Sequence, residues 1–266
     1  MARAGIPAST YRVQFNKDFR FLDCRDIVPY LHMLGIGALY SSPRFKARRG
    51  SEHGYDVASP LRVNSELGTE EEFSELCNKL RDYELGLVLD IVPNHMSASD
   101  ENPWWMDVLE NGPSSPYAHY FDIEWHPFIS KAAFLQDNKV LLPILGDLYG
   151  NVLERGELSP GIEEIGFLLR YYDRKVPLDP ASYGRILDVW LSHLAGEYPR
   201  QQEAVTELQS VISLVRGIPP PTAVEPAQIA FRLDEARTVK KRIFELYRDN
   251  LDARAAFDST LRQFGE

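Results

Sequence analysis

Three polar residues close a strongly apolar segment of the chain. The segment Leu87–Val92 is apolar except for Asp90, and Asn94 and His95 follow it within three positions. Placing a carboxylate, an amide and an imidazole at the end of a buried strand costs free energy unless each finds a polar partner. In a (β/α)₈ protein, the carboxyl ends of the strands are where active sites are built. The pattern therefore indicates a functional site.

A second candidate site lies upstream, in the segment Ser51–Asp56, which reads SEHGYD. The ring of Tyr55 offers an apolar face on which the C–H face of a sugar can stack. Taken alone, the segment is equally compatible with a turn anchored by an aromatic residue. The polar residues downstream favour a site, so we group Tyr55 with His53, Asp56 and His95 as candidate substrate-binding residues.

Strands and helices alternate over the first hundred residues. Short strands are predicted at 10–15, 38–41 and 87–92, and helices are predicted between them at 23–34 and 69–83. An alternation of this kind predicts a parallel sheet. The apolar run of the third strand further predicts that this strand is buried on both faces.

Local signals define where these helices begin and end. Thr69 and Glu72 form a T-x-x-E capping box, and Gly86 is placed to end that helix in a left-handed conformation. Pro29 lies inside the first predicted helix and lacks an amide donor. We therefore expect the first helix to start late or to kink.

The alternation stops after His95, and the sequence predicts three domains. These are 1–96, the N-terminal βα units of a barrel; 97–182, an irregular insertion; and 183–266, a helical subdomain. Helices in the last part are predicted at 186–194, 203–215, 226–248 and 251–264. The predicted fold class is α/β: an incomplete TIM-type (β/α)₈ barrel, consisting of its first three βα units, with a large, mostly helical inserted subdomain.

Composition narrows the possible partners. The formal net charge is −10, from 39 acidic and 29 basic side chains, which argues against nucleic acid and suits a neutral ligand. No apolar run approaches the ~20 residues of a membrane helix, and no signal peptide is evident. Cys24 and Cys77 do not form a CxxC pattern. We therefore expect a soluble, cytoplasmic protein with reduced cysteines.

The polar residues around Asp90 carry a family resemblance. Leu89–His95 resembles the first conserved region of glycoside hydrolase family 13, the α-amylase superfamily. The Gly54-Tyr55-Asp56 element resembles the one that follows the second barrel strand in the same superfamily. Longer matches resemble the maltooligosyltrehalose synthases within it. These matches run from Thr10 to Pro180 and comprise 39–43, 50–56, 102–107, 141–147, 169–173 and 177–180.

This resemblance implies a trehalose-forming isomerase. The reducing-end α-1,4 bond of a maltooligosaccharide or glycogen-derived glucan would be converted to an α,α-1,1 linkage by retaining intramolecular transglycosylation. Such chemistry needs a carboxylate nucleophile and an acid/base carboxyl about 5–5.5 Å apart. The superfamily carries these groups on later strands, so we expect no catalytic residue in this chain and no activity from it alone.

The resemblance also assigns roles at the rim of the barrel. Tyr55 would stack against the sugar beside the scissile bond, and His95 would hydrogen-bond its hydroxyl groups. Asp56 and Asp90 would hold the rim in order, and Asn94 would fix the loop after the third strand. No cofactor and no metal site are expected.

Two alternatives remain open. An amylase-like hydrolase could use Asp234, because Phe231–Ala236 resembles the superfamily's second conserved region. That segment lies in a helical pattern with basic residues close behind, which favours a surface position on a helix. The other alternative is a glucan-binding or scaffold module without catalysis. An open barrel edge would also expose unpaired backbone groups, so we expect the isolated chain to self-associate, by dimerisation or aggregation, or to cover that edge with its C-terminal helices.

Overall fold

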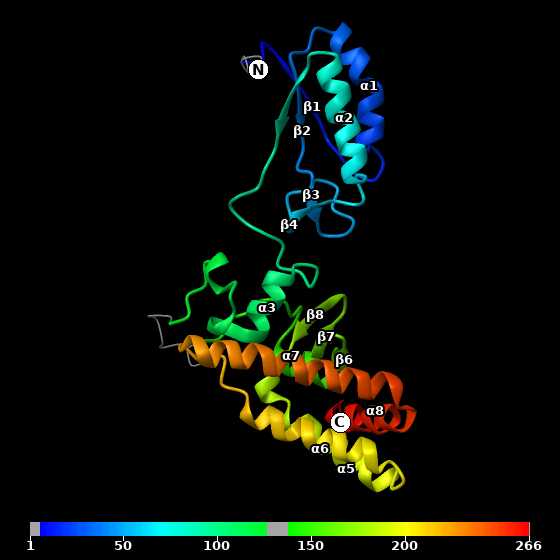
Figure 1. Cartoon of the computed structure of the whole chain (residues 1–266), viewed down its shortest axis with the longest axis vertical. Coiled ribbons are helices and arrows are strands. Elements are labelled where there is room, and N and C mark those ends of the chain that lie inside the picture. The colour runs from blue at the N-terminus through cyan, green and yellow to red at the C-terminus, as the bar shows by residue number, and fades with distance from the viewer. Residues whose placement is uncertain (1–5, 127–137, 266) are drawn as a thin grey trace. The chain divides into compact units, whose positions relative to one another are not determined.

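The structure is a computed structural model that describes residues 6–126 and 138–265. It consists of two compact units, Met1–Pro103 and Trp104–Glu266 (Figure 1). Each unit is built around a hydrophobic core of its own. The predicted α/β class is confirmed, because strands and helices alternate in the first unit and both element types occur in the second.

The first unit contains a three-stranded parallel sheet in the order β1-β2-β5. Its strands are β1 (Thr10–Val13), β2 (Ala38–Ser41) and β5 (Gly86–Leu89). A separate antiparallel pair, β3 (Phe45–Ala47) and β4 (Val57–Val63), lies in the connection between β2 and the next helix. The three parallel strands predicted from the sequence are therefore confirmed.

Two helices, α1 (Phe21–Met33) and α2 (Glu70–Asp82), pack against each other beside the parallel sheet (Figure 1). Their apolar stripes and the strands form one core, whose buried members are Val13, Phe15, Phe21, Cys24, Val28, Leu31, Leu39, Leu67, Phe73, Leu76, Leu80 and Leu85. The predicted capping box of α2 is confirmed. The Glu72 amide donates to Thr69 Oγ1 at 3.2 Å, and the Thr69 amide donates to Glu72 Oε2 at 2.8 Å.

Two predictions about helix ends are wrong. Helix α1 does not start late, since it begins at Phe21 and has Pro29 in its interior, while the alternative expectation of a kink stays a prediction. Helix α2 is not ended by a left-handed Gly86: Glu84 adopts the positive φ of 56°, and Gly86 is already the first residue of β5. Ala38 on the neighbouring strand explains this glycine, because a Cβ at position 86 would approach the Ala38 methyl group to 3.2 Å.

The prediction that the third strand is buried on both faces is also wrong. Val88 and Leu89 of β5 are each 40% exposed, and Ile91 beyond it is 60% exposed. Strand β5 pairs with β2 on one side and lies at the edge of the described sheet. An apolar run indicates that a strand tends to be buried, but the neighbouring elements decide whether it is.

The second unit combines helices with a small antiparallel sheet. Its helices are α3 (Pro103–Asn111), α4 (Tyr149–Glu154), α5 (Gly184–Glu197), α6 (Gln202–Gly217), α7 (Pro226–Asp249) and α8 (Leu251–Gly265). Its 3₁₀ turns are η1 (Gly112–Ser114), η2 (Ala118–Tyr120) and η3 (Pro180–Ser182). The sheet is a meander, with strands β6 (Leu158–Glu163), β7 (Gly166–Tyr171) and β8 (Arg174–Pro177). The four helices predicted after position 183 are confirmed as α5 to α8.

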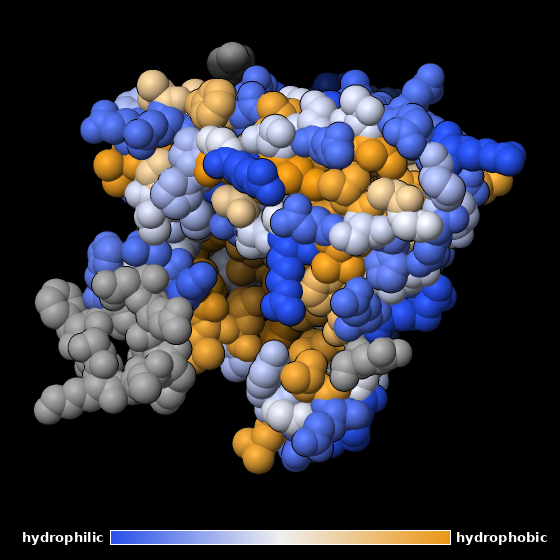
Figure 2. All heavy atoms as spheres, turned by 90° about the horizontal axis from the view of Figure 1, so that it is seen from below, coloured by the Kyte–Doolittle hydropathy of each residue, from blue (hydrophilic) through white to orange (hydrophobic). Residues whose placement is uncertain are grey.

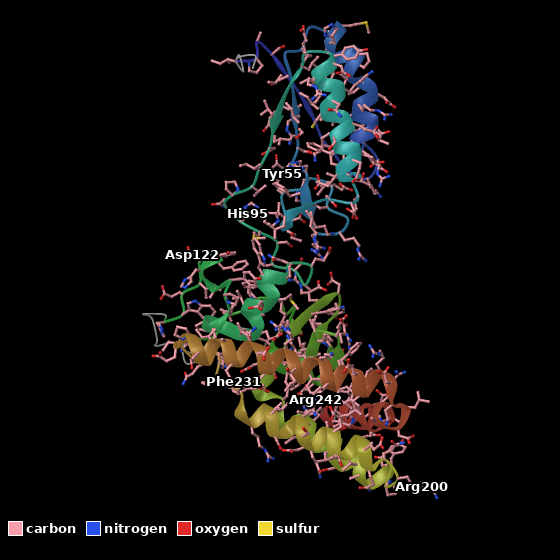
Figure 3. The ribbon with its side chains drawn as sticks, viewed as in Figure 1. Tyr55, His95, Asp122, Arg200, Phe231 and Arg242 are labelled. Atoms are coloured by element: carbon pink, nitrogen blue, oxygen red, sulfur yellow. The ribbon has the colours of Figure 1, made fainter. Side chains whose placement is uncertain are left out.

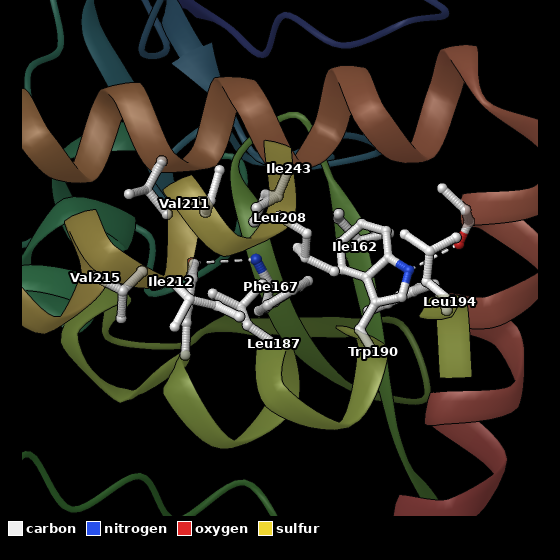
Figure 4. Packing of buried hydrophobic residues seen from close by; sticks show 14 of the residues in the cluster. Ile162, Phe167, Leu187, Trp190, Leu194, Leu208, Val211, Ile212, Val215 and Ile243 are labelled. Carbon is white, nitrogen blue, oxygen red and sulfur yellow. Dashed lines mark hydrogen bonds between the residues drawn. The ribbon is translucent and has the colours of Figure 1, made fainter. Parts of the chain in front are cut away.

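Helices α5 to α8 and the meander share one core (Figure 4). The indole of Trp190 in this core is fully buried and donates from Nε1 to the carbonyl of Ala253 at 2.8 Å. Phe167 of β7 stacks on Phe257 of α8 with ring centroids 5.4 Å apart. The sheet is therefore held by the helices through aromatic packing.

Residues 97–182 are more regular than the sequence predicts. The meander covers most of 158–177, and α3 and α4 precede it. Pro160, Gly161 and Gly166 interrupt the alternation of polar and apolar residues along these strands, which hides them from a pattern search. The division between the compact units follows Pro103, and residues 104–266 form one unit where the sequence analysis expects an insertion and a separate helical subdomain.

Hydrophobic side chains also reach the surface. Figure 2 shows apolar residues gathered among hydrophilic ones on one face. In the second unit the large exposed ones include Tyr120, Leu148, Tyr149 and Phe231. Within the described residues, none of the helices has the length and apolar character needed to cross a bilayer.

Candidate functional site

The hydroxyl of Tyr55 and the carboxylate of Asp90 meet at the carboxyl end of the parallel sheet. Tyr55 lies in the loop between β3 and β4, and Asp90 directly follows β5. The Tyr55 hydroxyl donates to Asp90 Oδ2 at 2.6 Å. Two residues 35 positions apart, singled out separately in the sequence, therefore belong to one cluster, and Figure 3 marks Tyr55 within it.

Arg12 and Tyr40 complete this cluster. Arg12 Nη2 donates to the Tyr55 hydroxyl at 3.0 Å and lies 3.8 Å from Asp90 Oδ2. The Tyr40 hydroxyl donates to the same carboxylate oxygen at 3.3 Å, and the Arg12 guanidinium lies 5.4 Å from the centre of the Tyr40 ring. The strand register explains why these side chains lie close together. Arg12, Tyr40 and Val88 are paired across β1, β2 and β5, and Asp90 is two residues beyond Val88 on the same face.

The charges in this cluster perturb the phenol of Tyr55. Its hydrogen bond to the Asp90 carboxylate raises the pKa of Tyr55, since ionisation would place two negative charges side by side. Arg12 acts in the opposite direction on Tyr55 and is outweighed. In turn, the hydrogen bond to Tyr55 is the main cause that raises the pKa of Arg12. At neutral pH the phenol is therefore a hydrogen-bond donor held between a cation and an anion.

His53 and Asp56 lie on either side of Tyr55 in the same loop. The rings of His53 and Tyr55 stack with centroids 5.9 Å apart and planes at 24°, and the Tyr55 amide donates to His53 Nδ1 at 3.0 Å. Asp56 accepts a hydrogen bond from the Ser51 hydroxyl and lies 3.9 Å from His53 Nδ1. The Asp56 carboxylate thus braces the loop that presents the two rings.

His95 is not joined to this cluster. Its side chain is exposed, and its hydrogen-bond partner among the described residues is Asn94, with Nδ2 and Nδ1 at 3.5 Å. Both residues lie after β5, in a segment without regular secondary structure (Figure 3). The structure therefore brings together Tyr55, His53, Asp56 and Asp90, and leaves Asn94 and His95 as an exposed pair.

A polar pocket adjoins the Tyr55 loop. It has a volume of about 420 Å³ and is lined by Gln14, Asn16, Lys17, Asp18, Gly50, Ser51, Glu52 and Glu66. Gln14 connects it to the cluster, because its Nε2 donates to the carbonyl of His53 at 3.2 Å and its Oε1 accepts from Arg12 at 3.1 Å. The pocket walls offer amide, hydroxyl, ammonium and carboxylate groups, which suit a ligand rich in hydroxyl groups.

Arg12, Gln14 and Tyr40 were not predicted from the sequence as site residues. A signal for two of them was present: Arg12 and Gln14 alternate with apolar residues at the carboxyl end of the first strand, the same edge of the sheet that Asp90 occupies. Tyr40, in contrast, lies within an otherwise unremarkable strand. Its role depends on the register with β1 and β5, which the sequence does not specify.

Asp234 lies on helix α7, away from any strand end. Its side chain is 75% exposed and pairs with Arg237 one turn later at 3.4 Å. The interpretation of Asp234 as a helix surface residue is therefore confirmed. In the portion of the chain that the structure describes, no group of three or more His, Cys, Asp or Glu side chains is gathered for metal binding.

Comparison with known proteins shows what this chain is similar to. The family model of the alpha amylase catalytic domain matches residues 25–143. A putative maltooligosyl trehalose synthase of Mycobacterium tuberculosis is 38% identical over 181 residues, which cover 65% of this chain and 22% of that protein. The chain thus spans about a fifth of the length of the curated relative.

Solved structures of maltooligosyl trehalose synthases are also similar to this chain. A crystal structure of a maltooligosyl trehalose synthase matches with a TM-score of 0.59 at 40% identity, covering 65% of this chain and 22% of its own. The maltooligosyltrehalose synthase of Arthrobacter ramosus matches with a TM-score of 0.55 at 38% identity, covering 65% and 21%. The chain is therefore similar to the maltooligosyl trehalose synthases over about two thirds of its length, and residues 25–143 match the alpha amylase catalytic domain, in agreement with the resemblance seen in its sequence.

Proposed function

We propose that this chain supplies the sugar-holding rim of an enzyme that isomerises the reducing-end α-1,4 bond of maltooligosaccharides to an α,α-1,1 linkage. The observation that carries this proposal is the Tyr55–Asp90–Arg12 cluster at the carboxyl end of three parallel strands. An aromatic ring fixed in place by an ion pair is a rigid platform, and rigidity lowers the entropy cost of holding a sugar. The substrate class is inferred from the similarity to maltooligosyl trehalose synthases.

The three parallel strands would be the first three of a (β/α)₈ barrel. In such a barrel the loops after the strands build the active site, and each of β1, β2 and β5 contributes a residue at or near its end to the cluster. Residues 97–182 would then be an excursion from the barrel between its third and fourth strands.

Each residue of the rim has a proposed role. Tyr55 stacks on the pyranose ring, with His53 beside it, while His95 donates to sugar hydroxyl groups. Asp90 and Asp56 position the platform, because their carboxylates are already engaged by Tyr55 and Ser51. The polar pocket beside Gln14 would take hydroxyl groups of the same glucan. Asn94 orients His95.

The bond-breaking carboxylates would be supplied by residues outside this chain. Retaining transfer needs a nucleophile and an acid/base about 5–5.5 Å apart in one cleft. Asp90 hydrogen-bonds Tyr55 and Tyr40, and Asp234 is exposed on a helix, so neither is placed as a nucleophile. The chain alone is accordingly proposed to bind glucan without turning it over.

Incubation with maltopentaose tests this proposal. We expect binding by isothermal titration calorimetry without new sugars in the chromatogram. Tyr55→Ala should weaken binding about tenfold, the loss of one stacking contact. Tyr30→Ala, a half-exposed tyrosine on α1 of the same unit, is the matched control and should bind normally.

Other outcomes would decide against it. New reducing ends would indicate an amylase-like hydrolase, and a non-reducing product would show that the chain is catalytically complete. Binding that survives Tyr55→Ala unchanged would remove the platform from the site. A chain that binds glucan through Tyr55, and that also fails to form active enzyme when joined to the rest of a maltooligosyl trehalose synthase, would be a binding or scaffold module.

A further inference from the structure

The second unit presents an aromatic group of its own. Trp104 of α3 and the residues Tyr117 and Tyr120 around η2 form what we call the aromatic trio. Trp104 stacks on Tyr117 with centroids 5.7 Å apart, and Tyr120 meets Trp104 edge to face at 5.1 Å. Tyr117 and Tyr120 also contact each other, at 5.6 Å. Every ring of the trio therefore touches both others.

Core packing does not account for the position of Tyr120. Its side chain is 60% exposed, whereas Trp190 and Tyr183 in the main core of this unit are fully buried. The local segment has other apolar contacts: Ala118 is buried, and Trp105 packs on Phe121 at 5.2 Å. A tyrosine that leaves most of its surface in water gains little from burial, so its ring remains available to a ligand.

The segment that carries the trio is pinned to α3. The hydroxyl of Ser115 donates to Asp107 Oδ1 at 2.5 Å and accepts from the Tyr117 amide at 3.1 Å. The Tyr120 amide donates to the carbonyl of Tyr117 at 2.9 Å, which closes the 3₁₀ turn. The exposed ring is therefore held by a hydrogen-bonded turn on a helix rather than by a free loop, which is the preorganisation that a binding platform requires.

Two polar residues lie within two positions of Tyr120 in the sequence. His119 and Asp122 flank Tyr120 in the sequence, and both are exposed (Figure 3). A pyranose has a C–H face that packs on an aromatic ring and hydroxyl groups that need donors and acceptors at the edge of that ring. We infer that the aromatic trio is a second glucan-binding platform, in which Tyr120 stacks on one glucose unit while His119 and Asp122 bond its hydroxyl groups.

The inference rests on the proposed function for the choice of an α-glucan, but its geometry is independent of the Tyr55 cluster. The acidic chain, at net charge −10, disfavours an anionic ligand, and Asp122 at the platform adds to this. A neutral, hydroxyl-rich ligand satisfies the aromatic face and the polar border together.

Titration of the full chain with maltoheptaose tests the platform. We expect two classes of site by calorimetry, and Tyr120→Ala should weaken one of them about tenfold. Tyr120→Phe keeps the ring and should bind as the parent chain does. Tyr149→Ala removes an equally exposed tyrosine of the same unit, at 63% exposure, and is the matched control.

Combining the variants separates this inference from the proposed function. If Tyr55→Ala loses glucan binding while Tyr120→Ala binds fully, the platform is overturned and the proposed function stands. If Tyr120→Ala loses one class of site while Tyr55→Ala binds fully, the platform stands and the proposed function is overturned. A measurement on the parent chain covers the case in which Tyr120→Ala does not fold. Maltoheptaose should shift the indole N–H resonance of Trp104, and a resonance unmoved at saturating sugar would overturn the platform.

Discussion

At the scale of single residues, Asp90 organises the candidate site. One of its oxygens accepts hydrogen bonds from the hydroxyls of Tyr55 and Tyr40, and the guanidinium of Arg12 lies near the same atom. Hydrogen bonds to a charged acceptor are stronger than those between neutral groups. Removing the charge of Asp90 should therefore weaken the hydrogen bonds of all its partners, whereas removing one partner would leave the other contacts of Asp90 in place.

Replacement of Asp90 by Asn should lower the pKa of Tyr55. The hydrogen bond to the Asp90 carboxylate is the main cause that raises this pKa, and Arg12, which lowers it, would remain. The pH titration of the Tyr55 ¹³Cζ resonance would measure the change. Asp56→Asn is the control, because Asp56 bonds Ser51 rather than the Tyr55 hydroxyl. An unchanged Tyr55 titration in Asp90→Asn would contradict the geometry of the cluster.

The same residues show how far the sequence alone could go. Tyr55 and Asp90 could be singled out because their signals are local. Tyr55 lies in the Gly54-Tyr55-Asp56 element, and Asp90 is a carboxylate at the end of an apolar segment. Arg12 gave only a weak local signal, as a polar residue alternating with apolar ones in the first strand, because the tyrosine to which it donates lies 43 residues away. His95 was expected beside Tyr55, but the segment after β5 lacks regular structure and holds it with Asn94 instead.

At the scale of elements, side-chain pairs tie neighbouring helices together. Arg242 of α7 grips Glu207 of α6 with two hydrogen bonds, at 2.6 and 2.8 Å, and also reaches Ser210 at 3.0 Å (Figure 3). The hydrogen bond to Arg242 is the main cause that lowers the pKa of Glu207. Bidentate pairing of this kind fixes the orientation of one helix on the other.

Replacement of Glu207 by Gln should destabilise the chain at neutral pH and not at acid pH. A carboxyl whose pKa is lower in the folded state stabilises the fold above its ordinary value of 4.5, and this contribution is lost as the pH falls through the folded pKa. Because Glu207 is 39% exposed, solvent screening limits the loss to about 0.5–1 kcal/mol at pH 7.

Urea unfolding at pH 7 and pH 3 measures this difference. Asp234→Asn is the control on α7, where the ion pair with Arg237 is mostly in solvent, and it should change little at either pH. An equal loss in Glu207→Gln at both pH values would attribute the effect to packing rather than to charge.

Helix positions were predictable because their signals are local. The capping box at Thr69 and the apolar stripes of α5 to α8 lie within a few turns of the chain. The meander of β6, β7 and β8 was not predicted, since antiparallel pairing depends on residues that face one another across turns. Glycine and proline also break its alternation, and a Cβ at Gly161 would collide with the Arg170 guanidinium on the neighbouring strand.

At the scale of the whole chain, the open edge of the parallel sheet stands out. The amides of Gly86 and Asp90 donate to carbonyls on the side of β2, at 3.0 and 3.1 Å. In a parallel strand alternate residues bond to opposite sides, so the backbone groups of Leu87 and Leu89 point to the free edge. The apolar sequence correctly indicated a strand, but could not indicate whether a further strand covers it.

We expect this edge to make the isolated chain self-associate. Backbone groups that have no partner among residues 6–126 and 138–265, beside exposed Val88 and Ile91, form a template for another strand, and a charged residue there opposes pairing. Leu89→Lys should weaken association about tenfold in sedimentation equilibrium. Leu34→Lys, which places the same charge at the exposed end of α1, is the control and should associate as the parent does. A parent chain that stays monomeric across the concentration range, with slow hydrogen exchange at Leu87 and Leu89, would mean that the edge is already covered.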